Sequence, residues 1–238
     1  MTTLIFGATG GVGAALARRL VDRDVVVHLA GRDASKLAAL HDELGSPTSV
    51  CDVLDDAQIA AAVEAAGPDL SGLAFCVGSI DLAPLRRVDR DLVRKSVELN
   101  AVSAAMALKA AEGALKKNNG SAVLFSSVAV AQGFAQHAAI SAAKGAVEGL
   151  VRAVAAEWAP KARINAIAPS LMKTGIAEPM TANETVADGI AKMHPMARLG
   201  EANDAAALAD FLLSEDAGWI CGEVFAVDGG RGRVRSRG

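Results

Sequence analysis

A glycine-rich turn directly after the first apolar segment restricts the fold of this chain more than any other feature. Thr3 to Phe6 is short and apolar, as in a buried strand, and four glycines fall between Gly7 and Gly13. Residues 11–23 then carry apolar side chains at helical spacing, with arginines on the opposite side. A strand, a tight turn and a helix in this order indicate the first unit of a parallel βαβ sheet.

The alternation of strand and helix continues along the chain. Further strands are predicted at 25–30, 49–51, 73–75, 121–125, 163–168 and 224–227, and further helices at 34–44 (capped by Asp33), 55–66, 89–117, 138–159 and 203–213. We therefore predict a doubly wound α/β fold of Rossmann type, in which a mostly parallel sheet carries helices on both faces. No Ser/Gly-rich linker and no internal repeat interrupts residues 1–230, which predicts a single domain.

Two segments fall outside this alternation. The connection 169–195 is long and mixed in composition, as in segments that cover a ligand site, so we predict a substrate lid there. Residues 231–238 form an arginine- and glycine-rich tail past the last strand. We expect this tail to be solvated, with binding of a phosphate or an acidic partner as the alternative.

Composition excludes several classes of protein. Hydrophobic residues make up 52% of the chain against 21% charged residues, unlike a disordered protein, and a net charge of −3 favours neither nucleic acid nor an anionic membrane. The three cysteines (Cys51, Cys76 and Cys221) lack the spacing of a metal site, so no metal is expected. Without a leader pattern or an apolar run that would span a bilayer, the expected location is the cytoplasm.

The glycine turn predicts a phosphate site. Glycine lets a pyrophosphate approach the backbone N–H groups at the N-terminus of a helix. The spacing G-x-x-x-G-x-G differs from the commoner G-x-G-x-x-G, and a plain strand-to-helix turn is the alternative. Its place in the first βαβ unit favours a dinucleotide. The residues predicted to hold its phosphates are Gly7, Thr9, Gly11, Val12 and Gly13.

The ends of the next two strands bear on the choice of cofactor. An acidic residue after the second strand would bind the ribose 2′-hydroxyl of NAD(H), whereas arginine suits a 2′-phosphate. Arg32 therefore favours NADP(H), and Asp33 beside it keeps NAD(H) possible. Asp52 and Val53, after the third strand, are predicted to contact the adenine, although Asp52 could instead begin a turn.

Motifs along nearly the whole chain resemble those of the short-chain dehydrogenase/reductase family. The glycine turn, the Cys51–Val53 segment, the strand-six motif Ile164–Pro169 and Asp228–Gly230 all match its pattern. The resemblance implies a nicotinamide-dependent oxidoreductase. It also implies catalytic roles for Asn100, Ser127 and Lys144, and cofactor contacts for Gly78, Pro169 and Lys144.

The chain departs from that pattern at two places. The family's N-N-A-G after the fourth strand is Phe75 to Gly78 here and keeps only the glycine. More importantly, Ile140 stands where the family has its catalytic tyrosine, thirteen residues after Ser127 and four before Lys144. The chain contains no tyrosine, so neither a shifted residue nor an identical subunit supplies the phenol.

Loss of the phenol affects the predicted chemistry. Reduction of a carbonyl needs a proton donor within hydrogen-bond reach of its oxygen, and losing such a donor costs roughly 10²–10⁴ in rate. His137, one turn before Ile140, titrates in the useful range and is a candidate substitute, with a structural role at the helix start as the alternative.

These observations lead to two main hypotheses. The first is an NADP(H)-dependent oxidoreductase with an altered proton donor, acting on an apolar carbonyl or alcohol substrate. The second is a nucleotide-binding protein without redox turnover, with a sensor or assembly role, which Ile140 and the altered segment 75–78 support. A lyase or isomerase that reuses the pocket is a third. Alanines in helices 89–117 and 138–159, together with the family resemblance, predict a homodimer or homotetramer.

Overall fold

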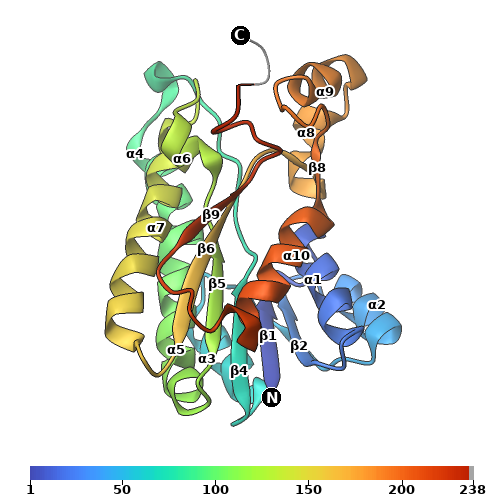
Figure 1. Ribbon diagram of the computed structural model, residues 1–238, viewed down its shortest axis with the longest axis vertical. Coiled ribbons are helices and arrows are strands. Elements are labelled where there is room, and N and C mark those ends of the chain that lie inside the picture. Colours follow the sequence, from blue (N-terminus) through green and yellow to red (C-terminus); the bar gives the residue numbers. More distant parts are fainter. Residues whose placement is uncertain (236–238) are drawn as a thin grey trace.

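The computed structural model describes residues 1–235, and a seven-stranded sheet forms its centre (Figure 1). All neighbouring strands run parallel, in the order β3-β2-β1-β4-β5-β6-β9. The strands are β1 (Thr2–Phe6), β2 (Val26–Gly31), β3 (Thr48–Val50), β4 (Leu70–Phe75), β5 (Ser121–Phe125), β6 (Arg163–Pro169) and β9 (Val224–Val227). This confirms the predicted doubly wound α/β fold. Residues 236–238 of the predicted tail lie outside the described residues.

Helices cover both faces of the sheet (Figure 1). One face packs on α1 (Gly11–Val21), α2 (Ala34–Leu44) and α10 (Ala202–Leu213), and the other on α3 (Asp56–Ala66), α5 (Ser103–Lys117) and α7 (Ala138–Trp158). Alternate residues of a strand point to opposite faces, so Leu4 and Phe6 of β1 join one core while Ile5 joins the other. Burial on both sides explains why these strands are continuous apolar runs.

Acidic side chains start several of the helices. The carboxylate of Asp33 accepts hydrogen bonds from the backbone N–H groups of Ser35 and Lys36, at 3.1 Å each, and so caps α2 as predicted. Gly45, with φ of 66°, ends the same helix in the left-handed conformation. The Asp33 carboxylate is therefore engaged at the start of α2.

The predicted helix 89–117 is not continuous. It consists of α4 (Arg90–Val97) and α5, joined by a π-helical turn over Glu98–Val102 that contains Asn100. The structure has further short elements after Ser127 and in the predicted lid, which the sequence did not predict. They are α6 (Val128–Gln132), β7 (Met172–Lys173), α8 (Glu178–Thr181) and α9 (Glu184–Ala191), with β7 paired to β8 (Gly200–Glu201).

The strand order reverses direction between β1 and β4. The chain leaves β1 toward β2 on one side and returns later to place β4 on the other. In open α/β sheets, ligands bind in the crevice that this reversal creates beyond the carboxyl ends of the strands. The fold therefore places its candidate site beside Gly7 and Cys76, which follow β1 and β4.

The alanines proposed as an assembly surface divide into two groups. Ala104, Ala107 and Ala111 of α5 are buried in the core of the single chain, whereas Ala142 and Ala146 of α7 are exposed. Homo-oligomer formation stays a prediction, and both helices expose small residues, since Ala110 of α5 is exposed as well. In residues 1–235, no helix has the length and apolarity needed to cross a membrane.

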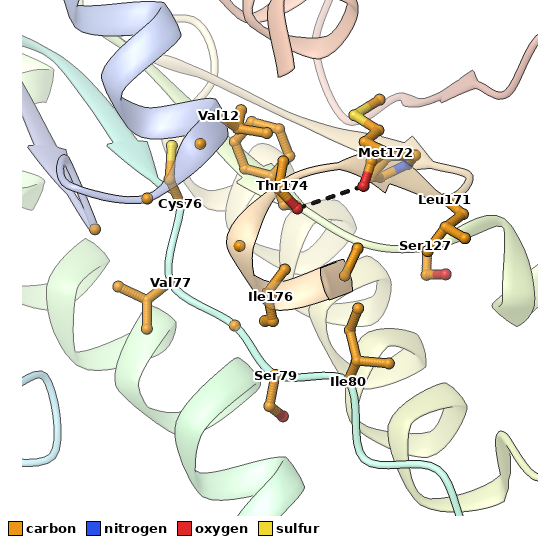
Figure 2. A pocket seen from close by; sticks show the side chains of 18 of the residues that line it. Val12, Cys76, Val77, Ser79, Ile80, Ser127, Leu171, Met172, Thr174 and Ile176 are labelled. Carbon is orange, nitrogen blue, oxygen red and sulfur yellow. Dashed lines mark hydrogen bonds between the residues drawn. The ribbon is translucent and has the colours of Figure 1, made fainter. Parts of the chain in front are cut away.

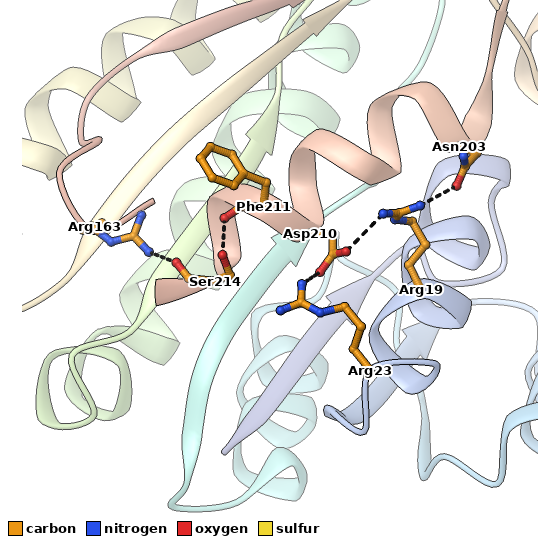
Figure 3. A network of polar contacts seen from close by, with 7 residues as sticks. All are labelled: Arg19, Arg23, Arg163, Asn203, Asp210, Phe211 and Ser214. Atoms are coloured by element: carbon orange, nitrogen blue, oxygen red, sulfur yellow. Dashed lines mark hydrogen bonds and ion pairs between the residues drawn. The ribbon is translucent and has the colours of Figure 1, made fainter. Parts of the chain in front are cut away.

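A buried carboxylate joins the first helix to the last. Arg19 and Arg23 of α1 both donate hydrogen bonds to Asp210 of α10, whose side chain is only 4% exposed (Figure 3). Nearby, the Arg163 guanidinium donates to the backbone carbonyl of Ser214 at 2.8 Å, at the end of α10. These contacts fix α10 against both α1 and β6.

Replacing Asp210 by Ala is expected to lower the free energy of unfolding by about 1.5–3 kcal/mol, because charge-assisted hydrogen bonds to both arginines are lost. Urea unfolding followed by circular dichroism measures the change. Glu43→Ala, which breaks the half-exposed ion pair with Arg18, is the control and should cost less than about 1 kcal/mol. Equal losses of unfolding free energy in the two variants would contradict the larger contribution expected from the Asp210 contacts.

Candidate functional site

A cavity of about 1160 Å³ opens at the carboxyl ends of the strands (Figure 2). The glycine turn and the end of β2 form one part of its wall, and the segment after β4 forms another. The end of β5, the first turn of α7 and the lid after β6 complete it. Figure 2 shows Val12, Cys76, Ser127 and Ile176 directed toward the same space from these different segments. The predicted lid therefore lies over the predicted cofactor turn.

The glycine turn leaves room for a ligand at the start of α1. A Cβ on Gly13 would lie 2.3 Å from the carbonyl oxygen of Gly7, so only glycine allows α1 to begin this close to β1. Gly7, Thr9, Gly11 and Val12 line the cavity, while Gly13 is buried behind them. The first N–H groups of α1 thus face a cradle that fits a pyrophosphate.

The end of β2, beside the glycine turn, adds two cations to the wall of the cavity. Arg32 and Lys36 both line it and both are exposed, so they are accessible to a ligand. Lys36 was not singled out from the sequence, because a solvent-facing lysine in a helix has no local signal. Val53 also lines the cavity, whereas the carboxylate of Asp52 accepts a hydrogen bond from Leu54 N at 3.1 Å and begins a turn.

Lys144 occupies the centre of the site. Its ammonium donates a hydrogen bond to the carbonyl oxygen of Phe125 at 2.8 Å, which joins α7 to the end of β5. A Cβ on Gly78 would lie 3.1 Å from Lys144 Nζ and 3.0 Å from Asn100 Oδ1. Gly78 therefore allows the segment after β4 to pass between these two side chains, which explains why the glycine is the part of the family motif that this chain keeps.

Asn100 is hydrogen-bonded to the segment after β4 that carries Gly78. The side chain is 1% exposed and does not line the cavity. Its amide nitrogen donates to Ser79 Oγ at 3.0 Å and to the carbonyl of Ser96 at 2.8 Å, and its oxygen accepts from Ser79 N at 3.2 Å. The Asn100 amide joins the Ser96 carbonyl, just before the π-helical turn, to the segment after β4. Asn100 thus positions the wall that carries Gly78.

Ser127 and Ile140 face the cavity together. Ser127 Oγ accepts a hydrogen bond from Ala129 N at 3.2 Å and caps α6, while Ser126 Oγ turns away to donate to Glu148 at 2.7 Å. Ile140 is 5% exposed and lines the cavity one helical turn from Lys144. The wall between the serine and the lysine is therefore hydrocarbon.

The two histidines near the site differ in their surroundings. His137 lines the cavity, and its Nδ1 lies 2.8 Å from the carbonyl of Ala135. His194 is buried in the lid, with Nε2 at 2.8 Å from Ser170 Oγ and Nδ1 at 2.9 Å from the carbonyl of Ile190. Because both ring nitrogens of His194 are hydrogen-bonded within the lid, that residue holds the lid together.

Burial shifts the titration of two groups in the wall. Desolvation lowers the pKa of Lys144 to about 8, with the neighbouring Cys76 opposing the shift. Desolvation also raises the pKa of the Cys76 thiol to about 12, against the influence of Lys144. Cys76 is thus a neutral thiol at pH 7, and Lys144 is a cation that releases its proton readily.

The arrangement fits a dinucleotide and a small substrate. A cradle for phosphates, two cations after β2 and the buried Lys144 ammonium all line one cavity. Pro169 lines it where β6 ends. Within residues 1–235, no group of His, Cys, Asp and Glu side chains lies close enough together to hold a metal ion.

Comparison with known proteins finds similarity along nearly the whole chain. The family profile described as Enoyl-(Acyl carrier protein) reductase matches residues 7–231. Dehydrogenase/reductase SDR family member 4 of Rattus norvegicus is 32% identical over 238 residues, which cover 95% of this chain and 85% of the rat protein.

Solved structures agree with this result. A short-chain type dehydrogenase/reductase from Mycobacterium ulcerans is 31% identical with a TM-score of 0.92, covering 98% of this chain and 90% of the other. The structure of ElxO with NADP bound is 28% identical with a TM-score of 0.89, covering 97% and 98% of the two chains.

The depressed pKa of Lys144 is expected to make stability depend on pH. The unfolded lysine titrates near 10.5 and the folded one near 8. Between these values the unfolded chain holds a proton that the folded chain has released. Lys144 should therefore contribute a rise in the free energy of unfolding across this window, on the order of 3 kcal/mol. The difference between the wild type and a variant without the lysine isolates this rise, because the Cys76 thiol, with its raised pKa, opposes it above pH 9.

Urea unfolding at several pH values measures this rise in the protein without cofactor. Lys144→Met keeps the packing of the side chain but removes the titrating group, so its curve should lack this contribution. Parallel curves for the two proteins between pH 8 and 10.5 would show that the lysine is not desolvated.

Proposed function

Because the chain belongs to the short-chain dehydrogenase/reductase family, we propose that it is an NADP(H)-dependent oxidoreductase of carbonyl and alcohol substrates whose proton donor differs from the family's tyrosine. The observation that carries this proposal is the grouping around Gly78. Lys144 and Asn100 hold that segment from two sides, and Ser127 faces the same cavity. This grouping supports a nicotinamide site although the phenol is missing.

The charges at the β2 end of the cavity support NADP(H). Arg32 and Lys36 both reach the cavity, where a 2′-phosphate would bind. The acidic alternative, Asp33, already caps α2 with its carboxylate, which makes it a poorer partner for a ribose 2′-hydroxyl. The structure of ElxO, with NADP bound, shows that a similar fold holds this cofactor.

Replacing Arg32 by Ala is expected to narrow the preference for NADPH over NADH. A charge-assisted contact to the 2′-phosphate is worth roughly 1.5–3 kcal/mol, so wild-type affinity should favour NADPH about tenfold or more. Fluorescence titration with each cofactor measures both affinities. Lys36→Ala should reduce the difference between the NADPH and NADH affinities in the same way, since Lys36 lines the cavity beside Arg32. Equal affinities of the wild type for NADPH and NADH would overturn the proposed preference.

The proton for the substrate oxygen is proposed to come from Lys144. Bound NADPH supplies the hydride, and the oxygen of the carbonyl then needs a proton. Ile140 has none to give, while Lys144 lies one turn along the same helix face with its pKa near 8. Ser127 orients the carbonyl, because its hydroxyl proton is not used in capping α6. An ammonium with this pKa is matched to proton donation near neutral pH.

A second candidate function rests on Ile140 itself. Its buried side chain gives the wall beside Ser127 a hydrocarbon surface. The residues before Gly78, Cys76 and Val77, also lack the polar groups of the family motif. These features favour a nucleotide-binding protein without redox turnover, in which the cofactor is a ligand that the protein senses.

Replacing Ile140 by Tyr tests the two candidates against each other. The phenol would lie one turn from Lys144 and near Ser127, and carbonyl reduction of a generic diketone should increase on the order of 10²-fold if proton donation limits the rate. NADPH oxidation measures the rate. Ile140→Phe adds the ring without the hydroxyl, so it serves as the matched control and should give no gain.

An unchanged rate in Ile140→Tyr, with NADPH still bound, would favour the function without redox turnover. A fast wild-type rate that His137→Ala abolishes would instead assign the proton to the histidine.

A further inference from the structure

Arg231 lines the cavity beside the 169–195 segment, whereas the sequence favoured a solvated tail and gave binding of a phosphate or an acidic partner as the alternative. Arg231 is the first residue after the Asp228–Gly230 turn. Its guanidinium lies 4.5 Å from the centroid of the Phe134 ring, and its Nη2 is 3.5 Å from the sulfur of Met193. Arg231, Phe134 and Met193 all line the cavity. The chain end therefore contributes a cation to the substrate side.

The backbone holds Arg231 in this place. The two carboxylate oxygens of Asp228 accept hydrogen bonds from Gly230 N at 2.9 Å and from Gly232 N at 2.7 Å. The N–H of Arg231 itself donates to the Asp228 carbonyl at 3.1 Å. Hydrogen bonds on both sides of Arg231 thus close a tight turn that directs its side chain inward.

Burial lowers the pKa of the Arg231 guanidinium, and the charge of Asp228 partly opposes this shift. No Asp or Glu side chain in the described part of the chain forms an ion pair with the guanidinium, since the carboxylate of Asp228 is used by the turn. Contact with an aromatic face uses none of the N–H groups, so most of the donor fork stays available. A partly buried arginine with free donors is suited to a planar anion.

The charges that line the cavity differ in sign from those of the whole protein. The chain carries a net charge of −3, yet the cavity is lined by Arg32, Lys36, Lys144 and Arg231 against the single carboxylate of Asp33. Under the proposed function Arg32 and Lys36 bind the cofactor, and Lys144 donates the proton to the substrate oxygen. Arg231 is the cation that remains, and it lies among apolar side chains at the lid end.

We propose that Arg231 binds a carboxylate of the substrate, so that the substrate is an apolar carbonyl or hydroxy acid. This inference rests on the proposed function, which assigns Arg32 and Lys36 to the cofactor and Lys144 to proton donation. The apolar part of the acid would pack on Ile176, Met180, Ile190 and Met193, which line the lid side of the cavity. Arg231 is a specificity-determining residue in this scheme, because it fixes which end of the substrate faces Lys144.

The test compares octanoate with octanamide, which share shape and chain length but differ in charge. Isothermal titration calorimetry measures both dissociation constants for the free protein and for the protein with NADPH. A charge-assisted pair predicts that octanoate binds the wild type about tenfold or more tightly than octanamide. Arg231→Gln should bring this ratio close to one without changing the affinity for octanamide or for NADPH.

Arg233→Gln is the matched control, because it removes the same charge from an exposed residue of the same segment. This variant should leave the ratio of octanoate affinity to octanamide affinity unchanged. Arg231→Met, which keeps the apolar stem, replaces Arg231→Gln should that variant fail to fold.

Three results would overturn the inference. They are equal binding of the two probes to the wild type, no binding of either, and an equal fall of the ratio in the Arg231 and Arg233 variants. Failure of NADPH to bind the wild type would instead reject the proposed function. The comparison of probes on the free protein would still decide the role of Arg231.

Discussion

The hydrogen bond from the buried Lys144 ammonium to the Phe125 carbonyl is the contact on which the site depends. It joins α7 to the end of β5 and, through Gly78, to the segment that Asn100 holds after β4. Removing this cation from water has a cost, which the lowered pKa of about 8 expresses. A purely structural contact between a helix and a strand would not need a charged group. The fold therefore retains a desolvated amine at the point where three segments of the cavity wall meet.

The sequence was sufficient for the fold because each local signal agreed with the others. The apolar strands, the glycine turn and the cap at Asp33 all required a parallel sheet covered on both faces. The π-helical turn at Asn100 could not be predicted in this way. Apolar spacing continues through 89–117, and one extra residue in a turn changes only which backbone groups pair. The helices of the lid are short, so their few residues carry too little periodicity to be recognised.

The candidate site was predictable where a residue type is required by backbone geometry or by a motif. Gly7, Ser127 and Lys144 line one cavity, as the resemblance implied. Lys36 and Arg231 were not identified, although they line the same cavity. A cation on a helix surface or in a tail has the same local sequence whether it faces water or a ligand. Only the packing of distant segments, such as Phe134 against the chain end, distinguishes the two cases.

The missing phenol changes how the site must treat the negative charge that arrives with a hydride. A carbonyl that accepts hydride becomes an alkoxide, which is stabilised either by a proton or by a fixed positive charge nearby. Ile140 removes the usual proton but also excludes water from the wall, and a cation acts more strongly where the dielectric constant is low. Lys144, close to this wall, supplies both a charge and a labile proton. Under the proposed function, with a hydrocarbon at position 140, the charge and the proton of the buried amine would take the place of the missing hydroxyl group.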